Sequence, residues 1–192
     1  MQDRDERGAL WTTRGLARGK GTPLFGYVHS QRQRRCMHRR LCQVCGGPAD
    51  HTADGTLWLL DTADVEQPFP QSVEGTVQPP VCRRCAIEAP RLCPALRRGH
   101  ALVRVRHHAI AGVYGYLYRR CRSTGQAVAD REEYVYYDDS ARLRWVLAGQ
   151  LFVHLAGISH VPEDEIARWR EQAAAETPEA HAVGSSHHGQ GG

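Results

Sequence analysis

The sequence predicts an α+β fold in which a four-cysteine zinc module is joined to a small antiparallel sheet and C-terminal helices. Three observations predict it. Two Cys-x-x-Cys pairs lie at residues 42–45 and 82–85. Segments in which apolar and polar residues alternate follow the second pair, as in strands. Nearer the C-terminus, apolar residues recur at the three-and-four spacing of a helix.

The four paired cysteines have the composition of a structural metal site. Zn²⁺ prefers four tetrahedral ligands, and a structural site of this kind uses all of them for protein sulfur, leaving no position for a substrate. The first pair is followed by Gly46 and Gly47, which permit the tight backbone turn of a knuckle. We therefore expect one structural Zn²⁺ as the cofactor, bound by Cys42, Cys45, Cys82 and Cys85. A redox pair and disulfides are the alternatives.

Three further cysteines lie outside these pairs, namely Cys36, Cys93 and Cys121. With His38 or His100 they could form a second metal site, or they could be buried as small apolar groups. Disulfides rarely persist in a reducing compartment.

The chain has no run of 18 apolar residues, and its first 22 residues lack the apolar centre of a secretory signal. These features predict a cytoplasmic protein that contacts no membrane.

The composition along the chain predicts one folded unit with loose ends. Residues 1–22 are polar and basic and are expected to form a disordered arm, and residues 177–192 a disordered tail. Residues 23–176 are expected to form a single zinc-stabilised domain. Within it, residues 61–80 are acidic and rich in proline, which indicates a long loop.

Three elements are expected up to the second cysteine pair. Ser30 can cap a helix over residues 31–41, with Met37 facing inward. The apolar run at residues 55–60 predicts a buried strand. Residues 82–93 predict a short helix that a proline limits.

The second half of the chain is expected to contain a hairpin and two helices. Residue types alternate along residues 101–106 and again along residues 113–118, as they do on the two faces of a strand. This predicts two strands joined by a connection at residues 107–112. Residues 134–137 offer a third strand. Residues 138–140 can cap a long helix over residues 141–156, which should be the most buried helix. Pro162 and the three acids after it predict a last helix that ends near Ala175.

Basic residues are concentrated in two blocks that flank the cysteine pairs. Lys20 is the only lysine among the 25 lysine and arginine residues, and the net charge is +4. By direct count, the net charge is +7 over residues 1–45 and +9 over residues 82–125, whereas it is −6 over residues 46–81 and −6 over residues 126–192. The arginines that we select as candidate contacts to nucleic acid are Arg32, Arg35, Arg39, Arg83, Arg84, Arg104 and Arg106. A charged run that is only a solvated surface is the alternative reading.

Tyrosines alternate along the expected strand at residues 113–118. Tyr114, Tyr116 and Tyr118 should lie on one face, with Val113 and Leu117 on the other. An exposed face of this kind could stack on nucleic-acid bases. The alternative is a structural aromatic ladder, paired with Tyr134 or Tyr136 and covered by the expected helix that contains Trp145.

Motifs typical of several enzyme classes are absent from the sequence. It has no glycine-rich phosphate loop that ends in Gly-Lys-Ser/Thr, no Gly-x-Ser-x-Gly and no His-Glu-x-x-His. We identify no catalytic residue.

The order of knuckle, apolar strand and helix-borne second pair resembles a treble-clef or zinc-ribbon module, a class shared by many binding proteins and by HNH nucleases. The nuclease resemblance implies an Asp-His pair ahead of the second ligand pair. Asp50 and His51 are present but follow closely after Cys45, and the chain has no asparagine, so nuclease activity is the minor alternative.

The stretch from Arg32 to Pro48, together with Gln-Pro-Pro-Val-Cys-Arg-Arg-Cys at residues 78–85, resembles uncharacterised actinobacterial, phage-like zinc-binding proteins. That resemblance implies a bacterial, cytoplasmic setting and carries no activity.

Two functions therefore compete. The leading hypothesis is a zinc-stabilised nucleic-acid-binding protein of regulatory type, because basic blocks and tyrosines surround the expected metal. The alternative is a zinc-stabilised protein-interaction adaptor in a phage-derived or biosynthetic assembly, favoured by the acidic loop and the modest net charge. No small-molecule substrate is indicated.

Overall fold

The computed structural model describes residues 4–12, 28–62 and 72–175. The protein is α+β, as the sequence predicts, with one mixed seven-stranded sheet and five helices among these residues. In chain order the elements are β1 (Leu10–Trp11), α1 (Ser30–Arg39), β2 (His51–Thr52), β3 (Gly55–Asp61), β4 (Ser72–Thr76), α2 (Arg83–Leu92), α3 (Pro94–Arg98), β5 (His100–Arg120), β6 (Ala127–Tyr136), α4 (Ser140–Leu143), β7 (Val146–His160) and α5 (Glu163–Ala175).

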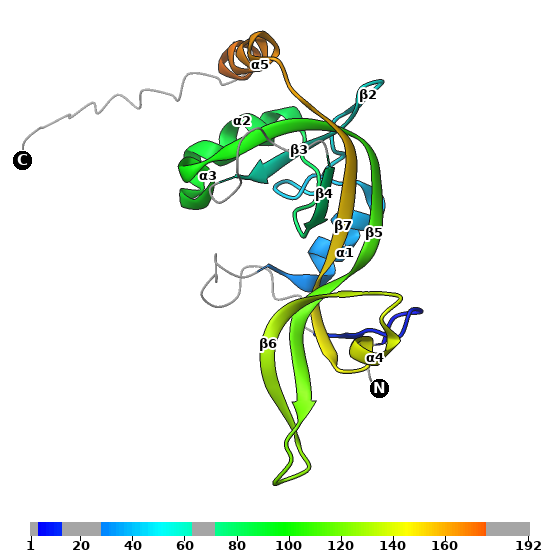
Figure 1. The fold of residues 1–192 in the computed structure, drawn as a ribbon. Coiled ribbons are helices and arrows are strands. Elements are labelled where there is room, and N and C mark those ends of the chain that lie inside the picture. The colour runs from blue at the N-terminus through cyan, green and yellow to red at the C-terminus, as the bar shows by residue number, and fades with distance from the viewer. Residues whose placement is uncertain (1–3, 13–27, 63–71, 176–192) are drawn as a thin grey trace, which may run out of the picture.

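The sheet is built on two long antiparallel strands, β5 and β7, which curve together through the whole molecule (Figure 1). Its strand order is β1-β7-β5-β3-β2, with β4 also pairing β7 and β6 also pairing β5. Only β1 runs parallel to its neighbour. The first part of β5 pairs with β3 and the later part with β6, so β5 connects the half of the fold that contains the cysteines to the other half.

The predicted hairpin over residues 101–118 is wrong, because these residues form the single strand β5. The connection expected at residues 107–112 contains no turn dipeptide such as Asn-Gly, and its backbone continues the ladder to β7 with a register shift between Ile110 and Gly112. A Cβ at Gly112 would lie 2.4 Å from a ring carbon of Phe152. The glycine therefore leaves room for this aromatic ring and does not mark a turn.

The predicted long helix over residues 141–156 is also wrong. Asp139 caps a helix there, accepting a hydrogen bond from the Arg142 N–H at 3.0 Å, but α4 has only four residues, and β7 follows. Leu151, Phe152 and Val153 are all buried, because both faces of β7 are covered at this point. A strand with two apolar faces gives a pattern that resembles a helical stripe.

Part of the predicted N-terminal arm is packed against the sheet. β1 pairs with β7, and Trp11 is 3% exposed. The Trp11 indole N–H donates a hydrogen bond to the Asp5 carboxylate at 2.9 Å. The prediction of a disordered arm is therefore wrong for residues 4–12, and residues 13–22 lie outside the described residues. β4 lies within the predicted acidic loop at residues 61–80, and residues 63–71 of that loop are not described. The predicted tail at 177–192 also lies outside the described residues.

Of the remaining helices, α1, α2 and α5 match their predictions in type and approximate position, whereas α3 was not predicted. α1 begins one residue earlier than expected, with His29 as its N-cap, and the Ser30 hydroxyl donates to the carbonyl of Thr12 at 3.1 Å instead of capping the helix. Met37 is buried, as expected. Cys82 is the N-cap of α2, and α5 begins with three acidic residues. The predicted third strand is confirmed as the end of β6.

Two apolar clusters occupy opposite faces of β3. Trp58 and Leu60 belong to the larger cluster, together with Met37 and the inner face of β7. Leu57 and Leu59 belong to the smaller one, which also contains Cys42, Cys85 and residues of α5. The alternation of β3 thus places the cysteines at the edge of a hydrophobic core.

Candidate metal centre

The first cysteine pair lies on a tight knuckle between α1 and β2. The Gly46 N–H donates to the carbonyl of Cys42 at 2.8 Å, and the Cys42 N–H donates to the carbonyl of Gly47 at 2.7 Å. Gly46 has a φ of 76°, a left-handed conformation that glycine adopts without steric cost. The local sequence therefore determines the turn that brings Cys42 and Cys45 together.

The second pair lies at the start of α2. Cys82 is the N-cap and Cys85 follows within the first turn, so both side chains lie at the same end of the helix. Two backbone hydrogen bonds attach this segment to the knuckle and its hairpin: Gln43 N–H to Pro80 carbonyl at 2.9 Å, and Asp50 N–H to Val81 carbonyl at 3.0 Å. The two pairs meet because these backbones are joined.

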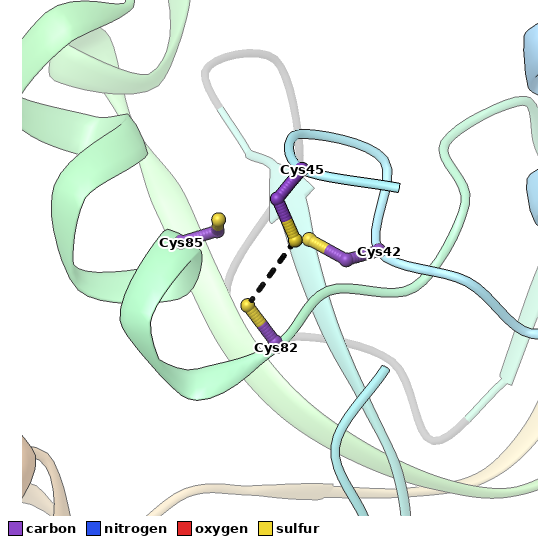
Figure 2. Close-up of side chains that lie close together, drawn as sticks. All are labelled: Cys42, Cys45, Cys82 and Cys85. Atoms are coloured by element: carbon purple, nitrogen blue, oxygen red, sulfur yellow. Dashed lines mark hydrogen bonds between the residues drawn. The ribbon is translucent and has the colours of Figure 1, made fainter. Parts of the chain in front are cut away.

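The four cysteine side chains, two from the knuckle and two from the start of α2, lie close together (Figure 2). Their sulfur atoms all lie within 4.8 Å of one another, and the Sγ atoms of Cys45 and Cys82 are 3.9 Å apart. All four cysteines are free thiols. Tetrahedral zinc with bonds of about 2.3 Å to sulfur would separate its ligands by about 3.8 Å. The cluster therefore has the size and donor set of a four-thiolate metal site.

The site lies partly in the core and partly at the surface. Cys42 is fully buried and Cys85 is 5% exposed, whereas Cys45 is exposed. Burial opposes ionisation of Cys42, but hydrogen bonds from the backbone amides of Cys45, Cys82 and Val44 lower its pKa overall. Burial raises the pKa of the Cys82 and Cys85 thiols. A metal ion that binds here must therefore displace protons from thiols.

A network of charged residues connects the cluster to β5 and α5. The Asp50 carboxylate pairs with Arg83 at 2.9 Å and with Arg104, whose side chain is only 6% exposed. Arg104 also reaches Glu165 of α5 at 3.5 Å. The guanidinium groups of Arg83 and Arg104 lie 5.3 and 5.5 Å from the centre of the Trp169 ring. This network fixes α5 against the cysteine module.

The same network engages the Asp-His pair that the nuclease resemblance implies. Asp50 is occupied by two arginines, and His51 Nδ1 lies 3.0 Å from the Thr56 hydroxyl across the β2–β3 pair. Among residues 4–12, 28–62 and 72–175, the four cysteines are the only group of three or more potential metal ligands.

The other cysteines do not meet in a second cluster within the described ranges. Cys36 is buried in α1, with its Sγ 3.7 Å from the carbonyl oxygen of Cys42. Burial raises the pKa of this thiol. Cys93 follows α2, and Cys121 lies in the turn after β5. The alternative of a buried apolar thiol therefore fits Cys36, whereas Cys93 and Cys121 are only partly covered.

The predicted basic residues divide into two groups. Arg104 is buried in ion pairs, Arg83 pairs with Asp50, and Arg84 pairs with Glu88 at 3.1 Å. Arg32, Arg35 and Arg39 are exposed along α1, and Arg106 is exposed on β5. The prediction that all seven face a polyanion is wrong for Arg104, because a carboxylate from a distant part of the chain neutralises it.

The tyrosine face is present but has acidic neighbours. Val113 and Leu117 are buried, and Tyr116 is 49% exposed. The Tyr114 ring lies 4.8 Å from that of Tyr134, and its hydroxyl donates to Glu132 at 2.8 Å. Burial, followed by this carboxylate, raises the pKa of Tyr114 to about 12. Tyr118 is half-buried beside the segment of Trp145. The predicted covering helix is wrong, because Trp145 lies between α4 and β7 and belongs to no helix.

Sequence reasoning missed two residues that organise the site and the sheet. Trp169 lies within the predicted last helix, but the local sequence does not show that its ring is buried beside the guanidinium groups of Arg83 and Arg104. Gln33 is 3% exposed inside a basic helix, and nothing in the local pattern distinguishes it from the exposed Gln31.

The fold and the cluster define an α+β protein with a four-cysteine site that could hold one metal ion. Comparison of the chain with protein-family models, curated proteins and solved structures finds no match. The resemblance to actinobacterial phage-like proteins and the cytoplasmic location therefore stay predictions. None of the described helices has both the length and the apolar character needed to cross a membrane.

Proposed function

We propose that the four cysteines bind one structural Zn²⁺ in a treble-clef-like module and that the protein binds nucleic acid through α1. The order of a knuckle, the β2–β3 pair and a helix that carries the last two ligands supports the treble-clef assignment. Four thiolates would occupy all four tetrahedral positions of zinc, which favours a structural role over a catalytic one.

The solvent face of α1 is the observation that carries the nucleic-acid proposal. Arg32, Arg35 and Arg39 are exposed at helical spacing, the helix contains no acidic residue, and none of the three forms an ion pair with any residue that the structure describes. Arg83, Arg84, Arg104 and Arg119, by contrast, have carboxylate partners. A row of unneutralised guanidinium groups attracts phosphates, with release of counterions.

The basic face is attached to the cysteine knuckle. The Arg32 guanidinium donates to the carbonyl of Val44, which lies between Cys42 and Cys45. A cavity of about 220 Å³ opens between α1 and the knuckle and is lined in part by His29, Arg32 and Gln43. Both ring nitrogens of His29 are buried without a hydrogen-bond partner among the described residues. A ring N–H of His29 could therefore donate a hydrogen bond to a phosphate oxygen beside the arginines.

Fluorescence anisotropy with random-sequence DNA duplexes and single strands across a salt series tests the proposal. The wild type should bind with an affinity that falls steeply as salt rises. Replacing Arg32, Arg35 and Arg39 with glutamine should weaken binding and reduce the logarithmic salt slope by about 2–3, since each lost phosphate contact removes roughly 0.7–0.9. The matched control replaces the exposed Arg144, Arg168 and Arg170 with glutamine. Equal losses in both variants would contradict a role specific to α1.

A protein-interaction adaptor is the second candidate, and the tyrosine face favours it. Tyr116, Tyr134 and Tyr136 are 49, 42 and 39% exposed, and the rings of Tyr134 and Tyr136 pack edge-on against the buried Phe152. Glu132 lies among them, and a carboxylate there opposes phosphate while leaving aromatic surface for a protein partner. If Tyr134→Ala abolishes copurification of a partner and leaves nucleic-acid affinity unchanged, the adaptor assignment is favoured.

A further inference from the structure

A two-stranded arm extends from the sheet at the end of β5. Pairing between β5 and β7 ends at Leu117 with Val146, whereas β5 and β6 continue to pair as far as Arg120 with Ala127. We call residues 118–129 the β5–β6 arm. It projects away from the rest of the protein in Figure 1. A register shift between Leu117 and Tyr118 lies at its base.

The arm is exposed but its tip is held in one conformation. Two-stranded ribbons have little stability alone, and here nearly every residue from Arg119 to Ala129 is exposed, with only Cys121 and Val128 partly covered. At the tip, the Cys121 N–H donates to the Gln126 carbonyl at 2.7 Å and the Gly125 N–H donates to the Cys121 carbonyl at 2.9 Å. Arg120 Nε also donates to the Gly125 carbonyl at 3.2 Å. The arm therefore presents a defined turn to solvent.

Its side chains are cationic on one strand and small on the other. β5 and the turn contribute Arg119, Arg120 and Arg122, and β6 contributes Ala127, Val128 and Ala129 opposite them. No acidic residue lies between positions 118 and 129. Asp130 at the base is neutralised by Arg119 at 3.0 Å and by Arg131 at 2.7 Å. Arg122 forms no ion pair with any described residue, so its charge is available to a partner.

We propose that the β5–β6 arm enters the major groove of duplex DNA and contacts base edges with Arg122 and Gln126. This inference rests on the nucleic-acid function proposed above and assigns duplex DNA as its ligand. Arginine pairs with guanine and glutamine with adenine in that groove. Both side chains are exposed at the turn, together with Ser123 and Thr124.

The dimensions of the arm suit that groove. Its strands are about 4.8 Å apart, and the major groove is about 12 Å wide and accommodates a two-stranded ribbon. The four residue-to-residue steps from Leu117 to Cys121 extend about 13 Å at roughly 3.3 Å per step, which exceeds a groove depth of about 8.5 Å. The small residues of β6 keep the ribbon slim. The major groove of A-form RNA is too narrow for such an element, so duplex DNA is the favoured ligand.

The test is selection from a pool of DNA duplexes with a randomised central segment, followed by anisotropy with a selected duplex and with the unselected pool. The wild type should enrich a sequence that it binds more tightly than the pool. The double variant Arg122→Ala with Gln126→Ala should lose roughly 30-fold or more of this discrimination, since it removes two base contacts worth roughly 5–100-fold each, and should keep its affinity for the pool within about threefold. The matched control is Arg170→Ala with Gln172→Ala on α5, where both residues are also exposed.

The outcomes separate this inference from the function on which it rests. If the wild type binds no nucleic acid, the proposed function fails. If it binds duplex DNA but selects no sequence, or if the arm variant keeps the full discrimination, the arm inference is overturned while the proposed function stands. Arm-dependent binding that favours double-stranded RNA or single strands over duplex DNA would also overturn the inference. So would arm-dependent binding of a glutamate-rich peptide more tightly than duplex DNA, because the partner would then be an acidic protein.

Discussion

The side-chain amide of Gln33 in α1 makes both backbone hydrogen bonds of Leu151 in β7. Its Nε2 donates to the Leu151 carbonyl at 2.8 Å, and its Oε1 accepts from the Leu151 N–H at 2.9 Å. Leu151 lies on the edge of β7 between the residues that pair with β1, at 147–148, and those that pair with β4, at 153–156. The glutamine therefore replaces a missing neighbouring strand at this point.

Gln33→Leu should destabilise the protein strongly. Leucine has a similar size but leaves a buried N–H and a buried carbonyl without partners, at a cost of about 1–3 kcal/mol for each. We expect the free energy of unfolding to fall by roughly 2–6 kcal/mol in urea titrations. Gln31→Leu, on the exposed side of the same helix, is the control and should change stability by less than about 0.5 kcal/mol. Equal effects of both substitutions would contradict the edge-pairing role.

The purified protein should contain one zinc ion per chain. Cys82→Ser removes one of the four convergent thiolates and should lower the zinc content toward zero and the melting temperature by many degrees, since zinc contributes on the order of 10 kcal/mol in zinc-finger peptides. Elemental analysis of protein handled without chelator measures the content. Zinc should also be released as the pH falls, because protons compete for the thiolates. Cys93→Ser, outside the cluster, should keep the metal. Zinc-free wild-type protein would end this assignment.

Asp50→Asn should destabilise the contact between α5 and the cysteine module. Arg104 would lose its main carboxylate partner while its side chain stays 6% exposed, leaving only Glu165 at 3.5 Å. Removing one partner of a buried ion pair costs about 3–5 kcal/mol. We expect a loss of about 3 kcal/mol in the free energy of unfolding, because Asp50 is itself 17% exposed. Chemical denaturation measures the loss. Asp54→Asn on the neighbouring exposed turn is the control, and a loss no greater than that of the control would show that the ion pair is not needed.

Cys121 should be a reactive thiol at neutral pH. Hydrogen bonds from the side chains of Ser123 and Thr124, followed by their backbone amides, lower its pKa to about 6; the Ser123 hydroxyl lies 3.2 Å from the sulfur. Because the thiolate is the nucleophile, the alkylation rate should rise with pH to a plateau, with a midpoint near pH 6. Mass spectrometry of the peptide after timed iodoacetamide treatment measures the rate.

Ser123→Ala should move the midpoint of Cys121 alkylation to higher pH, because the largest contribution to the lowered pKa is removed. Cys93 in the same samples serves as an internal reference. A Cys121 midpoint near 9 in the wild type would mean that the hydrogen bonds at the turn do not stabilise the thiolate.

Local chemistry accounts for the parts of the fold that were predicted correctly. The Cys-x-x-Cys spacings, Gly46 and the helical N-cap at Cys82 act within a few residues, so the knuckle and the start of α2 follow from the sequence around them. α5 is similar, because its proline and acidic first turn suit a helix terminus in any context. The convergence of the two pairs was predicted from zinc chemistry and is confirmed as a cluster of sulfurs.

The errors all concern interactions between distant parts of the chain. The segment after Leu143 has an apolar pattern compatible with either a helix or a strand. It forms a strand because its backbone pairs with β5. The same pairing keeps β5 continuous through residues 107–112. Residues 4–12 were expected to be loose because their own sequence has no apolar period, but Trp11 is buried against β7.

The sequence by itself determined the four-cysteine donor set, the starts of α2 and α5 and the positions of the basic blocks, since each depends on neighbouring residues. The tertiary structure decided which strands continue, which element covers the edge at Leu151, and which arginines are available. Arg104 and Arg35 look alike in the sequence, but only Arg104 lies against Asp50 and Glu165. The physical reason is that hydrogen bonds and ion pairs join groups that are close in space, and the chain brings those groups together only when it folds.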